Sequence, residues 1–511
     1  MHHLYDCVVV GSGHAGSCAA LSAVEGGCKK ALIIDKCPPE WVGGNGYFTA
    51  GAHRTAHQGL TDLWPIVRNV TQEMVGRIDM EAYSDEAFVS DIMRLGEGKP
   101  NLGLVTEMVA GSRSAVDWLA KVVRVPFIFT FHRQAYEVEG RQKFWGGMVL
   151  GVEDGGKGLI SAHQRALTEA GVEIWFQTTL VDLDVRENLV EGLVVEKDGT
   201  RIQIRTPAVV LAAGGFEANA AMRVQHLGQE WGRAMVRGTP YNTGDCFSIA
   251  QRAGARLVGD WKGCHSTAWD ANASPNSGHR ELTNQFTKSG YPLGIMVNCQ
   301  GKRFVDEGED FRNYTYAKFG RAILQQPHGF AFQVWDTKVL SRLRVEEYGD
   351  DVVEKILAND LEELADKLVE HGLQNKQNFL QSLHEFNEAV RYHRMEHAHL
   401  RWDPAVKDGL STQSEGSQLD LPKSNWALSI DEAPFVAVKV GCGITFTFGG
   451  LAIDPKTSGV ISEVTGTAIR GLFCAGEMVG DLFYNNYPGG SGLTAGAVFG
   501  RKAGQVAAQI S

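Results

Sequence analysis

The sequence predicts an α/β protein in which a parallel sheet is built from both ends of the chain and an α+β domain is inserted between them. Short apolar runs lead into glycine turns at 7–13, 208–215 and 471–476, as buried parallel strands do. The region 336–397 is instead helix-rich and more charged. With 511 residues the chain exceeds one ordinary core. We therefore predict one domain from 1–265 and 431–511, and an inserted cap from 266–430.

The N-terminal segment carries a dinucleotide-binding motif in the order strand, turn, helix, strand. Cys7–Val10 reads as a buried strand, and the glycines of a G-x-G-x-x-G motif follow at Gly11, Gly13 and Gly16. They permit the sharp turn, the approach of backbone to a pyrophosphate, and the packing of helix on strand. Asp35 ends the second strand, where an acidic side chain accepts hydrogen bonds from ribose hydroxyls. The motif predicts a Rossmann-like site without choosing between FAD and NAD.

Three further glycine-rich segments are also candidates to bind the cofactor through their backbone. The loop Gly43–Arg54 follows the second strand and lacks hydrophobic periodicity. Ala208–Phe216 reads as a buried strand that runs into a glycine turn, and Gly489–Leu493 opens a helix of small residues. Backbone N–H groups at such turns bind phosphate and other anionic groups. We expect these segments to wrap the cofactor.

The rest of the first domain reads as alternating helices and strands. Gly103–Val123 and Leu159–Ala170 have helical periodicity. Between 172 and 205, four segments alternate at period two, as antiparallel strands do. His393 and His397 are spaced to share a metal, but a charged solvent face without a third ligand is the better interpretation, and we predict no metal site. We interpret His14, inside the dinucleotide motif, as a variable position without a role.

Composition excludes several classes of protein. The net charge of −11 argues against nucleic-acid or anionic-membrane partners. Nine scattered cysteines without a C-x-x-C pair favour buried thiols in a reducing compartment. There is no apolar run long enough for a membrane span and no signal peptide, so we expect a cytoplasmic protein.

Taken together, the motifs resemble the FAD-binding subunit family of fumarate reductase and succinate dehydrogenase. The resemblance covers most of the chain and rests on the N-terminal motif and on segments at 43–45, 212–216, 242–245, 301–307, 449–450 and 475–477. It implies a Rossmann-like (GR2-type) FAD-binding domain with an inserted cap, and it selects non-covalent FAD as the cofactor. Segments 290–298, 310–318 and 486–493 make the tricarballylate dehydrogenase branch the most similar one.

The resemblance assigns cofactor contacts residue by residue. Toward the ADP half it implies Gly11, Gly13, Ala15 and Gly16 on the pyrophosphate, Asp35 and Lys36 at the ribose, Val181 at adenine, and Ala213 and Gly214 as a cover. Toward the flavin it implies Gly43, Gly44, Asn45 and Gly51 along the isoalloxazine, Asp245 at its edge, Glu477 on the ribityl chain, and the N–H groups of Ser491, Gly492 and Leu493 at N1 and O2. A helix N-terminus at that point would stabilise the anionic reduced flavin.

The catalytic set is where the chain departs from the family. Fumarate reductases grip a dicarboxylate with two histidines and two arginines. His265 resembles the first histidine, and Arg312 resembles the arginine that exchanges a proton with the substrate carbon. The second histidine is replaced by Phe446 and the second arginine by Tyr487. Losing a bidentate carboxylate clamp argues against simple fumarate as the substrate.

The aromatic replacements indicate either a larger, less charged ligand or ordinary core packing. We take His265 and Tyr487 as candidates to grip the substrate and Arg312 as the candidate proton shuttle. Because an arginine is a poor base, Tyr314 and Tyr316 compete for the proton-transfer role.

The leading hypothesis is FAD-dependent dehydrogenation of a carboxylate-bearing small molecule, with tricarballylate to cis-aconitate as the family model. A second hypothesis is desaturation of a ketone in steroid or natural-product metabolism, or the reverse reduction, because Tyr487 resembles the carbonyl-gripping tyrosine of ketosteroid Δ1-dehydrogenases. A third is a non-catalytic FAD electron-transfer subunit. No Fe–S or haem motif is present, so O2, a quinone or a separate redox protein would accept the electrons.

Overall fold

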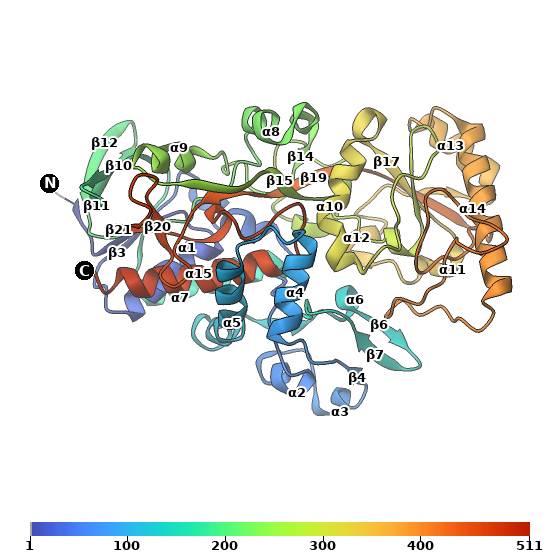
Figure 1. Cartoon of the computed structure of the whole chain (residues 1–511), viewed down its shortest axis with the longest axis horizontal. Helices are drawn as coiled ribbons and strands as arrows, with labels where there is room; N and C mark the ends of the chain where they lie inside the picture. The colour runs from blue at the N-terminus through green and yellow to red at the C-terminus, as the bar shows by residue number, and fades with distance from the viewer. Residues whose placement is uncertain (1–2, 511) are drawn as a thin grey trace.

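The computed structural model describes residues 3–510 and has the expected α/β architecture (Figure 1). Both described chain ends lie in one domain, at one end of the molecule. At its centre five parallel strands are arranged in the order β9–β3–β2–β13–β21. Their bounds are β2 (Cys7–Val10), β3 (Ala31–Ile34), β9 (Glu173–Trp175), β13 (Val209–Leu211) and β21 (Ala468–Cys474).

An antiparallel extension continues this sheet. It contains β10 (Thr178–Arg186), β11 (Leu189–Lys197) and β12 (Thr200–Arg205), with β1 (His3–Leu4) at its outer edge and β20 (Gly459–Ile461) beside β21. The pairing of β10, β11 and β12 is antiparallel, as the alternating pattern predicts. The prediction was wrong for 172–176, since β9 pairs parallel with β3. Alternation alone does not report the direction of a neighbouring strand.

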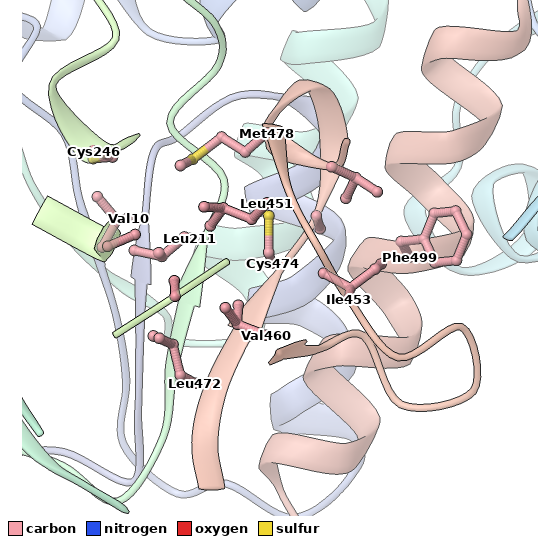
Figure 2. Close-up of a cluster of buried hydrophobic side chains, with 14 of the residues drawn as sticks. Val10, Leu211, Cys246, Leu451, Ile453, Val460, Leu472, Cys474, Met478 and Phe499 are labelled. Carbon is pink, nitrogen blue, oxygen red and sulfur yellow. The ribbon is translucent and has the colours of Figure 1, made fainter. Parts of the chain in front are cut away.

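The sheet packs against helices and a dense apolar core. Figure 2 shows Val10, Leu211, Leu472 and Cys474 in one apolar cluster, which Ile453 connects to Phe499 on the neighbouring helix. The covering helices are α1 (His14–Glu25), α7 (Gly155–Glu169) and α15 (Ser491–Ala507). The extended segments at the two chain ends thus pack into one core.

Helices α1 and α15 approach so closely that α15 needs glycine at the contact. A Cβ added at Gly504 would lie 2.1 Å from the carbonyl oxygen of Ala19. Helix propensity alone would make Gly504→Ala stabilising by about 1 kcal/mol. Because the clash is with backbone, we expect overpacking to win and the variant to lose about 2 kcal/mol of unfolding free energy.

Chemical denaturation of Gly504→Ala beside Gly76→Ala measures this difference. No atom lies within 4 Å of a Cβ added at Gly76, so that variant should be close to neutral. A Gly504→Ala protein more stable than the parent would contradict the packing account.

A second sheet links this domain to the cap (Figure 1). Its strands are β14 (Met235–Val236), β15 (Leu257–Asp270), β16 (Ile295–Asn298), β17 (Ala331–Trp335), β18 (Ile356–Ala358) and β19 (Phe435–Leu451). The long strands β15 and β19 pair antiparallel, with His265 opposite Phe446 and an irregularity directly after that pair. The irregular register places two predicted site residues side by side.

Helices surround the second sheet. They are α8 (Ala220–Leu227), α10 (Arg312–Leu324), α11 (Thr337–Leu340), α12 (Val345–Tyr348), α13 (Leu361–Glu370) and α14 (Lys376–Glu396). Helix α9 (Asp245–Arg252) instead packs on β10 of the first sheet. Helix α10 packs on β15 and β19, close to their irregular pairing. The helix-rich character of 336–397 matches the sequence pattern.

Residues 60–152 form a further layer. The helix predicted at Gly103–Val123 is present, whereas the short strands of this layer were not predicted. Its helices are α2 (Leu60–Leu63), α3 (Gln72–Val75), α4 (Asp85–Leu95), α5 (Leu102–Trp118) and α6 (Phe131–Gln134). Its strands are β4 (Ile78–Asp79), β5 (Phe127–Phe129), β6 (Ala135–Val138), β7 (Arg141–Phe144) and β8 (Leu150–Val152). Such short, partly polar strands carry little periodic signal.

Two global expectations can be compared with the structure. All nine cysteines lie in the described part of the chain, where they are buried and form no disulfide. Within residues 3–510, no helix combines the length and apolar character needed to cross a membrane.

Candidate active site

One large cavity lies where the two sheets and the glycine turns meet. It encloses about 1570 Å³, including solvent at its mouth. Its lining includes Gly11 and Asp35 of the dinucleotide motif together with His265 and Tyr487. One cavity therefore reaches from the predicted cofactor segment to the predicted substrate residues.

Most predicted cofactor residues line this cavity. They are Gly11, Gly13, Ala15, Asp35, Lys36, Gly44, Asn45, Ala213, Gly214, Asp245, Glu477, Gly492 and Leu493. Gly16, Gly43, Gly51, Val181 and Ser491 are not among its lining residues. Gly16 instead lets α1 pack, since a Cβ there would lie 2.0 Å from the Gly11 carbonyl oxygen.

The dinucleotide motif presents open backbone to the cavity. Gly11 has φ +108°, and a Cβ there would lie 2.3 Å from the carbonyl oxygen of Ala212. A Cβ at Gly13 would have only ordinary contact with the protein, 3.7 Å from the Gly43 carbonyl oxygen. Asp35 is held by Ser12, whose backbone N–H and hydroxyl donate to its Oδ2 at 2.7 and 2.6 Å. The space beside Gly13 is therefore available to a phosphate-bearing ligand.

Buried carboxyl groups support the middle of the cavity. Glu477 accepts a hydrogen bond from the backbone N–H of Thr447 at 2.7 Å, and Glu217 accepts one from Asn242 at 2.6 Å. The amide of Asn45 also donates to Glu217. Burial raises the pKa of both glutamates. The charge of Glu217 raises the pKa of Glu477 further, whereas a hydrogen bond from Glu477 favours the ionised form of Glu217. This arrangement fixes Asn45 at the cavity wall.

Two arginines and a histidine make another part of the cavity electropositive. Arg133, Arg237 and His265 all line it and are at most 8% exposed. Within residues 3–510, Arg133 Nη1, Arg237 Nε and both ring nitrogens of His265 have no hydrogen-bond partner. Buried polar groups left in this state are costly unless a ligand pairs with them. The arrangement suits an anion.

Burial also sets the charges of these groups. It lowers the pKa of Arg133 to about 9, with a further contribution from nearby Arg344. Burial lowers the pKa of His265 well below its usual value, and the charges of Arg237 and Arg133 add to that effect. At neutral pH both arginines are cationic and His265 is neutral, with one N–H to donate.

Aromatic side chains face this group. The ring centroid of His265 lies 5.0 Å from the ring centroid of Tyr316 and 5.3 Å from that of Tyr487. Phe446 stacks on Tyr487 at 5.9 Å, with 8° between the ring planes. Burial, followed by the charge and hydroxyl of Tyr316, raises the pKa of Tyr487. Tyr487 therefore remains a hydrogen-bond donor over the physiological pH range.

The structure does not bring all predicted catalytic residues to the cavity. Arg312 lies against a separate small cavity, with its guanidinium 5.6 Å from the ring of Trp145. Tyr314 is also outside the large cavity and donates to Asp91 at 2.7 Å. Tyr316, the competing candidate, lines the large cavity instead. Its side chain projects differently from that of Tyr314 because successive residues turn by about 100° on a helix.

Arg133 and Arg237 were missed by sequence reasoning. Arg133 lies in α6, a helix of four residues, and Arg237 directly follows the two-residue strand β14. Elements this short carry no periodicity that would orient a side chain. An arginine within a largely apolar stretch was the only local signal, as in Val125–Phe131 before Arg133.

His14 has a structural role, contrary to its interpretation as a variable position. Its Nε2 lies 2.9 Å from the Leu493 carbonyl oxygen, and its Nδ1 lies 2.9 Å from His163 Nε2. A carbonyl only accepts, so His14 donates through Nε2 and accepts from His163. Cys18 Sγ lies within 4.8 Å of the facing nitrogens of this pair, but those nitrogens already satisfy one another. The contact joins α1 to the first turn of α15.

Comparisons with known proteins agree with this geometry. The model of the family described as "FAD binding domain" matches residues 6–493. The chain is 28% identical over 512 residues to the NADH:fumarate oxidoreductase of Klebsiella pneumoniae (strain 342), covering 99% of this chain and 48% of that protein. It is 27% identical over 530 residues to the fumarate reductase (cytochrome) of Shewanella frigidimarina, covering 100% of this chain and 78% of that protein.

A solved structure shows the same fold. The 3-ketosteroid Δ1-dehydrogenase from Sterolibacterium denitrificans superposes with a TM-score of 0.72 at 19% identity, over 100% of both chains. The present chain belongs to the FAD-binding domain family, that of the fumarate reductase and succinate dehydrogenase flavoproteins, whose named members are FAD-dependent oxidoreductases. It spans about half the length of the first of these relatives. The open glycine surface at Gly13 and the glycine turns that line the same cavity fit FAD.

Proposed function

We propose that this chain, with FAD bound, interconverts CH–CH and C=C bonds beside a carboxylate of a small-molecule substrate. The observation that carries the proposal is the set of unpaired, buried nitrogens on Arg133, Arg237 and His265 in the same cavity as the dinucleotide motif. Tricarballylate-like polycarboxylates belong to this substrate class. The names of the relatives, fumarate oxidoreductase and fumarate reductase, describe reactions of the same type.

The two arginines would grip the carboxylate. Their planar guanidinium groups pair with carboxylates through two parallel hydrogen bonds. The N–H of neutral His265 would add a donor where charge develops on the carboxylate or carbonyl oxygen. This set takes the place of the histidine and arginine that Phe446 and Tyr487 replace.

FAD would lie along the glycine turns, with Asp35 at its ribose and Gly492 and Leu493 at the pyrimidine edge of the flavin. When bound, it supplies the acceptor or donor of the hydride. Tyr316 would transfer the proton at the substrate carbon next to the one that exchanges the hydride. Tyr487 would hold the substrate in place. In the dehydrogenation direction the substrate thus loses a hydride from one carbon and a proton from the next.

The aromatic wall favours a second candidate, desaturation of a ketone. Tyr487 and Tyr316 together form a hydroxyl pair that suits a carbonyl oxygen, and Phe446 offers an apolar face to a ring. The two candidates differ in the charge that the substrate carries. The buried arginines make the carboxylate the better choice, since a neutral ketone would bring no negative charge to Arg133 Nη1 and Arg237 Nε.

Anaerobic bleaching of the bound flavin separates the two candidates. The FAD-loaded protein is mixed with saturated polycarboxylates, tricarballylate among them, and with cyclic ketones of similar size. We expect bleaching by carboxylates. Bleaching only by ketones would establish the second candidate, and bleaching by neither would favour an electron-transfer subunit without its own substrate. We further propose that O2, a quinone or a separate redox protein exchanges electrons with the flavin.

Replacing Tyr316 with phenylalanine tests the proton-transfer role. We expect a loss in turnover of about 100-fold or more, within the range for general acid–base groups, with FAD content unchanged. Stopped-flow measurement of the flavin reaction reports this step. Tyr314→Phe is the matched control, because that hydroxyl pairs with Asp91 outside the cavity. Equal losses in both variants would contradict the assignment.

A further inference from the structure

Arg54 is a fully buried cation directly behind the wall of the cofactor cavity. Its side chain is 0% exposed. The Nε donates to the carbonyl oxygen of Gly489 at 2.8 Å, and the backbone N–H donates to that of Gly490 at 3.3 Å. Gly490 lines the cavity and precedes α15. Arg54 therefore packs directly against the turn that precedes α15, on the side away from the cavity.

The charge of Arg54 is incompletely balanced. Its Nη1 donates to Tyr83 at 3.0 Å, while its Nη2 is buried and has no partner among the described residues. The nearest carboxylate, Asp91, lies 3.9 Å away and also pairs with Arg94 at 3.1 Å. The guanidinium carbon lies 5.4 and 5.1 Å from the ring centroids of Tyr83 and Tyr314.

The wider network does not remove this excess. Arg94 also pairs with Asp310, which is shared with Lys407. Three cations, Arg54, Arg94 and Lys407, thus face two anions, Asp91 and Asp310. Arg94 and Lys407 are 48% and 50% exposed, so water screens them. The unscreened positive charge is the one on Arg54.

We propose that Arg54 is an electrostatic positioning residue that, together with the N-terminus of α15, stabilises negative charge on the flavin and makes it easier to reduce. This inference rests on the proposed placement of the flavin edge at Gly492 and Leu493. A helix N-terminus carries about half a positive charge, spread over its free N–H groups. A buried full charge beside the helix N-terminus adds to the positive electrostatic potential at the flavin edge, and the low dielectric constant of the interior screens it little. Neither contribution needs Arg54 to touch the cofactor.

Sulfite affinity of the oxidised FAD-loaded protein tests the proposal, because sulfite adds to the flavin and leaves negative charge on it. A buried unit charge acting over roughly 10 Å at an effective dielectric constant of about 20 changes such an equilibrium about tenfold. We expect Arg54→Met to weaken sulfite binding by about that factor and to lower the midpoint potential. Arg54→Lys should keep most of the parental affinity.

Two further variants make the test independent of how Arg54→Met folds. Asp91→Asn removes the counter-charge while preserving shape, so it should strengthen sulfite binding and raise the potential. Arg94→Met removes an equal charge from the same network at an exposed position. It should change sulfite affinity by no more than about twofold and leave the midpoint potential close to that of the parent protein. Unchanged sulfite binding in a folded, FAD-loaded Arg54→Met protein would overturn the proposal. A shift of Asp91→Asn in the same direction as Arg54→Met would also overturn it. If sulfite affinity and midpoint potential do not change as expected while carboxylates still bleach the flavin, the role of Arg54 is wrong and the proposed function stands.

Discussion

Arg133→Met is expected to lower kcat/KM for a carboxylate substrate by about 100-fold. The variant removes a buried cation and its hydrogen bonds to the substrate, which are worth about 3 kcal/mol for a charged partner. Each 1.36 kcal/mol changes the rate constant about tenfold. Steady-state kinetics with an artificial electron acceptor measure the effect, and the flavin spectrum confirms that FAD remains bound.

Arg312→Met is the matched comparison for that variant. Both arginines are 8% exposed, but only Arg133 lines the large cavity. We expect a clearly smaller loss in Arg312→Met. A larger loss there than in Arg133→Met would restore Arg312 as the proton shuttle and contradict the assignment made from the geometry.

The same arginine predicts a pH dependence. Burial lowers the pKa of Arg133 to about 9, so its charge is present below that pH and is lost above it. We expect KM for a carboxylate substrate to rise as the pH passes through about 9 in the parent protein. In Arg133→Met the rise in KM near pH 9 should be absent.

Gly13→Val is expected to weaken FAD binding by about 100-fold or more without unfolding the protein. Gly13 has φ −72°, which valine tolerates, and a Cβ there meets protein only at 3.7 Å. The added methyl groups would instead fill the space assigned to the pyrophosphate, where overpacking costs a few kcal/mol. Fluorescence titration of the apoprotein with FAD measures the affinity.

Thermal unfolding of the two apoproteins separates a blocked site from a damaged fold. Gly76→Val serves as the control, since that position is open and lies away from the cavity. Apo Gly13→Val should unfold at the parental temperature. Parental FAD affinity in this variant would show that the pyrophosphate lies elsewhere.

Local patterns were enough to predict most segments that line the cavity we assign to the cofactor. The motif at Gly11 and Gly13 and the turns at Gly214 and Gly490 combine strand, glycine and helix within a few residues, so each can be read alone. Their convergence at one cavity follows from parallel strands that end at a common edge. The fold class is confirmed for the same reason.

The substrate half depends on contacts between distant segments. Arg133, Arg237 and Tyr316 come from three elements that meet only after the cap and the 60–152 layer have packed. Choosing Tyr316 over Tyr314 requires the orientation of α10, which pattern alone does not give. Resemblance gave Arg312 the proton-transfer role by sequence position, whereas Tyr316 is the competing candidate that lines the large cavity.

The most direct test of the account compares one enoate with its methyl ester. Reduced, FAD-loaded protein is mixed anaerobically with fumarate, cis-aconitate or a longer unsaturated acid, and then with the ester of whichever acid reoxidises the flavin fastest. Reoxidation by the acid, and at least about 100-fold slower reoxidation by the ester, is the expected result because only the acid pairs with Arg133 and Arg237. Equal rates for acid and ester, or a faster ester, would contradict a carboxylate-gripping active site.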